Sequence, residues 1–313
     1  MAACQGTRCA GERAVSYYRQ YDAQIIPCEV VYIHAKSVFS TPGCISELNV
    51  NRVGRNLTTI RYPPMHALIV YCHPEPLSFN GALKDTTISA LTDAGYRVEV
   101  SDLYAEDFDP VEHPRHYAPR ACPVRFFPLT EQGYAYREHK LASDVQREIA
   151  RLQRADLIII QFPLWWHAQP AVLKGWFDRV FVYGGLYSGK MRYDSGLLGS
   201  KRVICSVTTG APGRTFERHG RSGDIVRLLW PIHYSLYYLG LKVLAPNVIF
   251  GVQGGGLRYE DEKALHARLD AERHAWSGRV ATLHEEYSLP FAGWDDWDEH
   301  GTLKMSHPQR WAQ

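Results

Sequence analysis

Three short segments of the chain combine residue types that bind flat or charged ligands. The first, residues 73–80 (HPEPLSFN), places Ser78 and Asn80 where a helix is predicted to begin. Backbone N–H groups at a helix start lack partners and the helix dipole favours an anion, so a phosphate or pyrophosphate would fit there. Ordinary helix capping uses the same residue types, and the segment contains neither a GxGxxG nor a GxxxxGK[ST] motif.

The second segment, residues 163–169 (PLWWHAQ), holds two adjacent tryptophans and a histidine. Neighbouring tryptophans do not easily face one core, so we expect at least one to line a cavity; a core aromatic cluster is the alternative. The third segment, residues 208–213 (TTGAPG), offers hydroxyls and backbone N–H groups that could bind the polar edge of a heteroaromatic ring, unless it is a plain turn. Together the segments favour a site for a planar cofactor.

Each of these segments follows a predicted strand. The run Ile158–Ile160 is continuously apolar, which is typical of a parallel strand buried on both faces. Strands are predicted at 66–72, 97–101, 156–162, 202–207 and 242–250, and helices at 80–94, 143–154, 170–180, 224–239 and 260–284. This alternation predicts an α/β fold with a doubly wound, five-stranded parallel sheet of flavodoxin-like order 2-1-3-4-5. The three segments should then meet at one edge of the sheet.

The chain divides into three parts by composition. Residues 1–64 show weak periodicity and are expected to be a poorly ordered N-terminal extension. The regular alternation begins at Met65, so the domain is predicted to span 65–290, with a C-terminal tail at 291–313 that is rich in tryptophan. Residues 107–130 contain five prolines and predict a long excursion with little regular structure.

Charge and cysteine content exclude several classes of protein. The net charge of +2 gives no sign of binding to nucleic acid or to an acidic membrane, and no apolar run is long enough to span a bilayer. Four of the seven cysteines lie in the first 44 residues, with a spacing that fits no zinc motif, so no metal site is predicted. The absence of a signal-peptide pattern and the scattered thiols favour a reduced, cytoplasmic protein.

Beyond these separate motifs, the region 65–260 resembles the flavodoxin-like NAD(P)H:quinone oxidoreductases, the DT-diaphorase and modulator-of-drug-activity family. The matching segments keep their order and spacing over roughly 200 residues. They are HPEPLSFN, SDLYAEDFDP, AYREHKL, ADLIIIQFPLWWHAQPAVLKGWFDRVF, SVTTGAPG and LLWPIHYSLYYLGLKVLAP.

The resemblance implies a bound flavin, FAD with FMN as the alternative, and NAD(P)H as cosubstrate. It also implies which residues hold them. By position, the phosphates and the adenosine side of the flavin would be held by His73, Ser78, Phe79, Asn80 and Ala82. The flavin ring and the ribityl chain would lie along Pro163, Leu164, Trp165, Trp166 and His167. The edge of the ring would be bound by Thr208, Thr209, Gly210 and Ala211. The quinone would contact Trp166, Tyr187 and Phe216, with Tyr187 coming from the partner subunit of a homodimer.

The chain departs from the family pattern at several of these positions. Relatives carry a tyrosine and a histidine that assist hydride transfer, and here those positions hold Phe216 and Ser222. Neither side chain can act as that acid pair, so the catalytic residues stay open, with His167 and His219 as candidates. His167 itself stands where the family has an aromatic residue.

The predicted function is two-electron hydride transfer from NAD(P)H through the flavin to a quinone. A flavin serves this role because it performs the redox chemistry while the protein positions the reactants. Two alternatives are an azo- or nitro-compound reductase and a flavin-binding regulatory subunit of a membrane transporter. A one-electron flavodoxin shuttle is disfavoured, because such shuttles are typically strongly acidic and this chain is not.

Overall fold

The computed structural model describes residues 65–252 and 259–306. The predicted N-terminal extension, residues 1–64, lies outside the described residues. The first described strand, β1, begins at His66, directly after Met65.

The strands form one parallel sheet in the order β2-β1-β3-β4-β5, with β6 paired to β4. The bounds are β1 His66–Tyr71, β2 Arg97–Asp102, β3 Leu157–Pro163, β4 Arg202–Thr208, β5 Lys242–Val243 and β6 Asn247–Ile249. This confirms the predicted doubly wound, flavodoxin-like order. The predicted fifth strand at 242–250 is divided in two around Ala245-Pro246, because proline has no N–H to continue a ladder.

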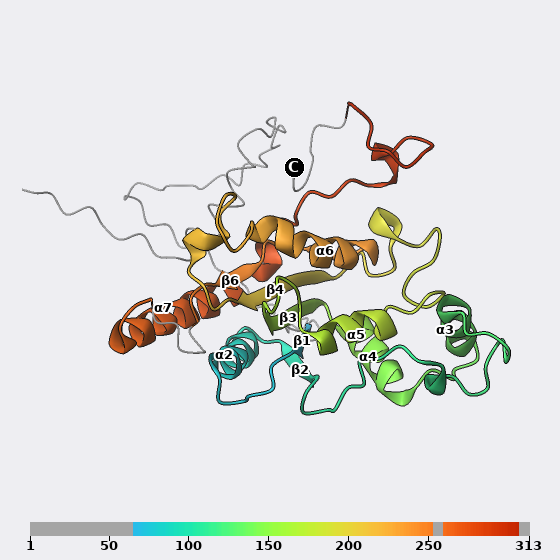
Figure 1. Ribbon diagram of the computed structural model, residues 1–313, viewed down its shortest axis with the longest axis horizontal. Helices are drawn as coiled ribbons and strands as arrows, with labels where there is room; N and C mark the ends of the chain where they lie inside the picture. Colours follow the sequence, from blue (N-terminus) through green and yellow to red (C-terminus); the bar gives the residue numbers. More distant parts are fainter. Residues whose placement is uncertain (1–64, 253–258, 307–313) are drawn as a thin grey trace, which may run out of the picture.

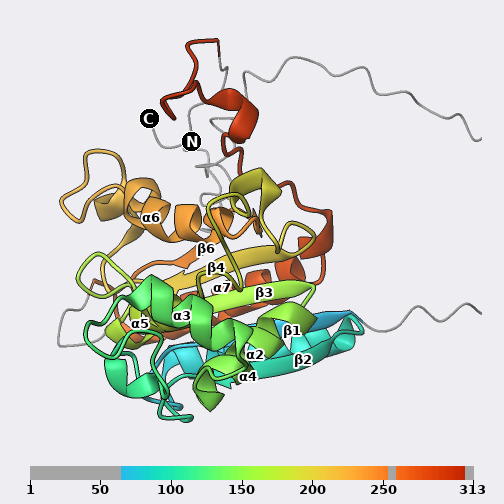
Figure 2. The same cartoon turned by 90° about the vertical axis from the view of Figure 1, so that its right-hand side faces the viewer.

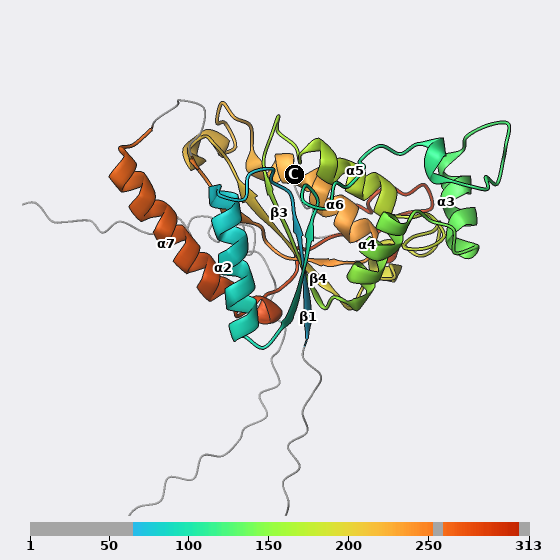
Figure 3. The ribbon, with the colours of Figure 1, turned by 90° about the horizontal axis from the view of Figure 1, so that it is seen from below.

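Helices cover both faces of the sheet. On one face lie α2 (Phe79–Asp93) and α7 (Glu262–Val280), which pack against each other. On the other lie α4 (Ser143–Arg154), α5 (Ala171–Val180) and α6 (Ile225–Tyr238), with α3 (Pro128–Arg137) further out on the same side (Figure 3). Because β3 lies between the two layers, all seven of its residues are buried, which explains its continuously apolar sequence.

Two segments lie outside the sheet and the helices that cover it. Residues 107–127 carry only one short 3-10 helix among them, Pro114–His116, as their prolines predict. The C-terminal residues 291–306 lead away from the sheet on the side of α6 (Figures 1 and 2). At the start of this segment the ring of Phe291 stacks on Tyr237 of α6 at 4.6 Å, and further along Trp294 and Trp297 pack against Tyr193. No helix in the described part of the chain combines the length and hydropathy needed to cross a membrane.

Two fully buried tryptophans join neighbouring helices on the two faces of the sheet by different hydrogen bonds. On one side, Trp176 Nε1 of α5 donates to the carboxylate of Glu148 in α4 at 2.9 Å. On the other, Trp276 Nε1 of α7 donates to the hydroxyl of Thr87 in α2 at 2.8 Å. Glu148 also accepts from Ser101 and Arg151, so its buried carboxylate depends on a complete set of donors.

Replacing each tryptophan by phenylalanine tests that difference. Both changes remove similar apolar volume, but Trp176→Phe also takes a donor from a buried charge. We expect Trp176→Phe to lower the free energy of unfolding by about 2 kcal/mol more than the loss of a hydrogen bond to a neutral group lowers it. Trp276→Phe, which removes a bond to a hydroxyl, is the matched control. Urea unfolding of both variants measures the difference, and equal losses would contradict the assigned role of Glu148.

Candidate functional site

The parallel register of β1, β3 and β4 brings the three sequence segments to one edge of the sheet. Tyr71 at the end of β1 pairs with Gln161, and Pro163 at the end of β3 pairs with Thr208 at the end of β4. The loops that follow therefore leave the sheet side by side, next to the start of α2 (Figure 3). Carboxyl edges of this kind are where open α/β sheets bind ligands.

The first loop leads into the start of α2, where Ser78 is the N-cap residue. The hydroxyl of Ser78 accepts from the N–H of Gly81 at 3.2 Å and lies 3.0 Å from Nδ1 of His73. The N–H groups of Phe79 and Asn80 have no acceptor among the described residues, and the first turn of α2 has no acidic residue. Such an end attracts an anion. A side chain at Gly81 would overlap the carbonyl group of Pro76, so glycine keeps the loop against the helix.

Buried amide groups join the first loop to the third. Asn80 Nδ2 donates to Thr208 Oγ1 at 2.9 Å, and Gln161 Nε2 donates to the carbonyl oxygen of Asn80 at 2.6 Å. The remaining side-chain oxygens, Asn80 Oδ1 and Gln161 Oε1, are buried and accept no hydrogen bond within the described part of the chain. Sequence reasoning did not single out Gln161, although it is the one polar side chain in LIIIQFP.

The second loop is a tight turn with a strained backbone. The N–H and carbonyl groups of Trp165 and Ala168 exchange two hydrogen bonds of 3.0 Å. Trp166 and His167 fill the turn at φ values of 51° and 62°, a left-handed conformation that costs a non-glycine residue free energy. Both tryptophans lie outside the core, Trp165 at 41% exposure and Trp166 at 95%. Strain of this kind is characteristic of functional sites.

The third loop offers fewer free donors than its sequence suggests. The N–H of Thr209 is bonded to the carbonyl of Ile249 at 3.0 Å, and its hydroxyl donates to the carbonyl of Ala211 at 2.9 Å. The N–H groups of Gly210 and Ala211 have no acceptor among the described residues. The hydroxyl of Thr208 accepts from Asn80 and keeps its own proton available. Two backbone donors and one hydroxyl are therefore available at this loop.

All three loops are also in contact with one another. Besides the Asn80–Thr208 bond, the N–H of Leu164 donates to the carbonyl of Thr208 at 2.8 Å. The rings of His73 and Trp165 lie 6.2 Å apart between centroids. The tertiary structure thus brings together the residues that the sequence analysis grouped as a cofactor site.

The positions that replace the family's acid pair have structural partners. Phe216 is only 6% exposed and packs against Phe250 with a centroid separation of 5.6 Å, so it belongs to the core. The hydroxyl of Ser222 donates to that of Thr215 at 2.9 Å and closes the loop. His219 is exposed near the tip of the same loop. A direct contact of Phe216 with substrate remains a prediction, and its burial argues against it.

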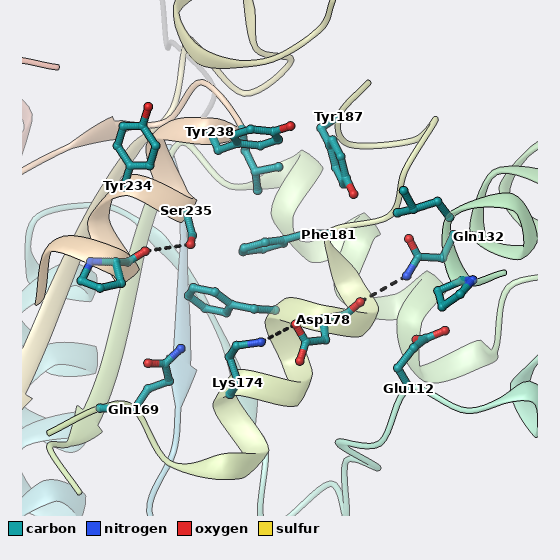
Figure 4. A pocket seen from close by; sticks show the side chains of 16 residues that line it. Glu112, Gln132, Gln169, Lys174, Asp178, Phe181, Tyr187, Tyr234, Ser235 and Tyr238 are labelled. Carbon is teal, nitrogen blue, oxygen red and sulfur yellow. Dashed lines mark hydrogen bonds and ion pairs between the residues drawn. The ribbon is translucent and has the colours of Figure 1, made fainter. Parts of the chain in front are cut away.

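Tyr187 lies in a separate hollow of about 730 Å³ between α5 and α6. Its ring meets those of Tyr183 and Tyr238 edge-on at 5.6 and 5.4 Å, and burial raises the pKa of its hydroxyl. Figure 4 shows Tyr187, Tyr238 and Phe181 gathered at one end of this hollow, with Gln169 at the other. Ala168 and Gln169 of the second loop border the hollow, whereas Trp166 and His167 do not. Sequence reasoning missed most of this lining because it comes from outward faces of helices.

The remaining reactive groups do not compete for a catalytic role. Burial raises the pKa of the thiols of Cys72 and Cys205 to about 12, so neither supplies a thiolate at neutral pH. No group of His, Cys, Asp and Glu side chains within 65–252 and 259–306 could hold a metal ion.

Known proteins share this arrangement. Residues 65–274 match the family described by its flavodoxin-like fold. The chain is 40% identical over 225 residues to ribosyldihydronicotinamide dehydrogenase [quinone] of Pongo abelii, covering 71% of this chain and 94% of that protein. It is 37% identical over 232 residues to NAD(P)H dehydrogenase [quinone] 1 of Rattus norvegicus, covering 72% and 80%. The crystal structure of a quinone reductase from Klebsiella pneumoniae superposes with a TM-score of 0.69 at 30% identity, covering 79% and 97%.

The left-handed turn gives a direct test of the site. His167→Gly should relieve the turn and stabilise the flavin-free protein by about 1 kcal/mol, raising Tm by about 2–4 °C. His139→Gly is the matched control, because His139 is also exposed and left-handed, at φ 54°, but follows α3. Both variants should gain stability in thermal unfolding, and only His167→Gly should change the affinity for flavin. An unchanged flavin affinity in both would place His167 outside the site.

Proposed function

The chain belongs to the flavodoxin-like family of quinone-reducing NAD(P)H dehydrogenases, and on that premise we propose that its three carboxyl-edge loops hold FAD. The enzyme is an oxidoreductase of this family. The observation that carries the proposed site is the set of unused hydrogen-bonding groups on the three loops. These groups lie on contacting loops at one edge of the sheet, where a single ligand can reach them.

The residues present fit such a cofactor. The N–H groups of Phe79 and Asn80 suit phosphate oxygens, since no acidic side chain in the first turn of α2 opposes an anion. The buried Oδ1 of Asn80 needs a hydrogen-bond donor, which a ribityl hydroxyl would supply. The ring of Trp166, 95% exposed, provides a flat apolar face for the ring system.

When bound, the flavin supplies the redox chemistry, accepting a hydride from the nicotinamide and returning two electrons to the quinone. The protein positions the reactants and stabilises charge. The N–H groups of Gly210 and Ala211 are fixed donors that stabilise negative charge developing at the ring edge. Phe216 and Ser222 provide no acid at neutral pH, so the exposed imidazole of His167 is the candidate proton carrier at the mouth of the site.

We further propose that the enzyme is a cytoplasmic homodimer with FAD, rather than FMN, as its cofactor. Tyr187 and the hollow it lines lie beside the second loop of the same chain without reaching Trp166. A second copy would let the hollow of one subunit face the ring site of the other and would cover the exposed Trp166. Sedimentation equilibrium of the flavin-loaded protein tests the assembly, and a monomer at micromolar concentration contradicts it.

The first experiment is a spectrum of the purified protein. We expect flavin absorbance, release of FAD on heating as identified by mass spectrometry, and reduction of quinones by NAD(P)H. Released FMN would correct the cofactor and leave the function standing. Protein that stays colourless after incubation with FAD and with FMN would overturn the proposed function.

Trp166→Ala tests the ring site. Because this side chain is 95% exposed, its removal should leave the Tm of the flavin-free protein unchanged. Loss of stacking should raise the Kd for flavin about tenfold, measured by fluorescence titration. Tyr287→Ala is the matched control, since Tyr287 is 96% exposed and lies in the segment after α7. Equal flavin affinities in the two variants would remove Trp166 from the site.

A further inference from the structure

An exposed basic loop connects the third loop to α6. Residues 213–227, which comprise this loop and the first three residues of α6, contain five basic side chains, all exposed, and only two acidic ones. The basic residues are Arg214, Arg218, His219, Arg221 and Arg227. Of the acidic residues, Asp224 is committed to capping α6, where its carboxylate accepts from the N–H of Val226 at 2.9 Å. Glu217 alone remains to offset the positive charge.

The four arginines of this loop form no ion pair with any residue in 65–252 or 259–306. Other arginines of the chain are paired with carboxylates, among them Arg151 with Glu148, Arg179 with Asp144 and Arg268 with Glu260. The guanidinium groups of this loop are therefore available to an anion from solution.

The loop that carries these arginines is held in a defined shape. The N–H of Ser222 donates to the carbonyl of Thr215 at 2.9 Å, and the two hydroxyls are bonded to each other. Phe216 anchors the loop in the core against Phe250. A side chain at Gly220 would overlap the carbonyl group of Thr215, so this close return of the chain requires glycine. The arginines thus project from a fixed frame rather than from a free tail.

The frame lies directly beside the proposed ring site. It begins two residues after Ala211, whose N–H is one of the free donors, and it ends at the N-terminal end of α6 (Figure 2). An anionic group carried by a molecule that enters the ring site would pass within reach of the guanidinium groups.

We propose that this arginine loop binds the phosphate groups of the nicotinamide cosubstrate and so selects a phosphorylated dinucleotide over a dihydronicotinamide riboside. The inference rests on the proposed function. The relatives named above include both a ribosyldihydronicotinamide and an NAD(P)H dehydrogenase, so family membership leaves this choice open. The riboside has no phosphate, whereas NADH carries a pyrophosphate and NADPH a further phosphate. The advantage from the arginines should therefore grow with the charge of the cosubstrate.

The test is the double variant Arg218→Gln/Arg221→Gln, assayed as the flavin-loaded enzyme with one quinone and three cosubstrates. We expect KM to rise about tenfold for NADPH, less for NADH, and not at all for dihydronicotinamide riboside. The kcat values should be unchanged, because hydride transfer takes place away from the phosphates. Raising the salt concentration should increase KM of the unaltered enzyme in the same order.

Arg97→Gln is the matched control. Arg97 is also exposed and forms no ion pair with a described residue, but it begins β2 at the opposite edge of the sheet. Its replacement changes the net charge in the same direction and should leave every KM unchanged. A general effect of net charge would instead appear in both variants.

Calorimetric titration with NADP⁺ gives a readout that does not depend on turnover. The double variant should bind NADP⁺ about tenfold more weakly than the Arg97→Gln control. Equal NADP⁺ affinities, or a riboside KM that rises as much as that of NADPH, would overturn the assignment of the loop while leaving quinone reduction intact. Failure of the proposed function is distinct, because the unaltered protein would then bind no flavin or turn over none of the three cosubstrates.

Discussion

The parallel alignment of β1, β3 and β4 is the constraint on which the rest of the structure depends. Each of these strands ends at the same edge, so the three following loops begin side by side there. β3 can occupy the middle only because helices bury both its faces. The helices of each layer are joined by a buried hydrogen bond. Glu148 joins α4 to α5 on one face of the sheet, and Trp276 joins α7 to α2 on the other.

Chemistry at this edge follows from which polar groups the fold has already used. Thr209 is hydrogen-bonded to Ile249 and Ala211, and the side-chain amide of Asn80 donates to Thr208. These hydrogen bonds fix the shape of the loops. The groups that remain free are a small set of backbone N–H groups and two buried amide oxygens, Asn80 Oδ1 and Gln161 Oε1. Fixed donors in a partly dry site need no reorganisation when charge develops, and this is how a scaffold of few reactive side chains supports redox chemistry.

Phe216 and Ser222, which stand where the family resemblance implies an acid pair, lie on one loop. Phe216 has become a core residue and Ser222 a loop closure, so the segment that would carry an acid pair instead serves as a rigid support. The same segment carries arginines with no partner in the described structure. On the proposed function, this loop affects how the reactants are held more than how the hydride moves, since the transfer itself depends on the cofactor.

The sequence by itself determined the sheet order and the three site loops, because strand periodicity and parallel topology together dictate where loops emerge. It could not show the role of Gln161, whose single polar side chain gains meaning only from the carbonyl of Asn80, 81 positions away in the chain. Only the tertiary structure shows that the N–H of Thr209 is already hydrogen-bonded to Ile249 and that Phe216 is buried. It also decided the division of the last strand at Pro246 and the hollow around Tyr187. Apart from the division at Pro246, each of these depends on contacts between segments distant in sequence, for which the local pattern carries no signal.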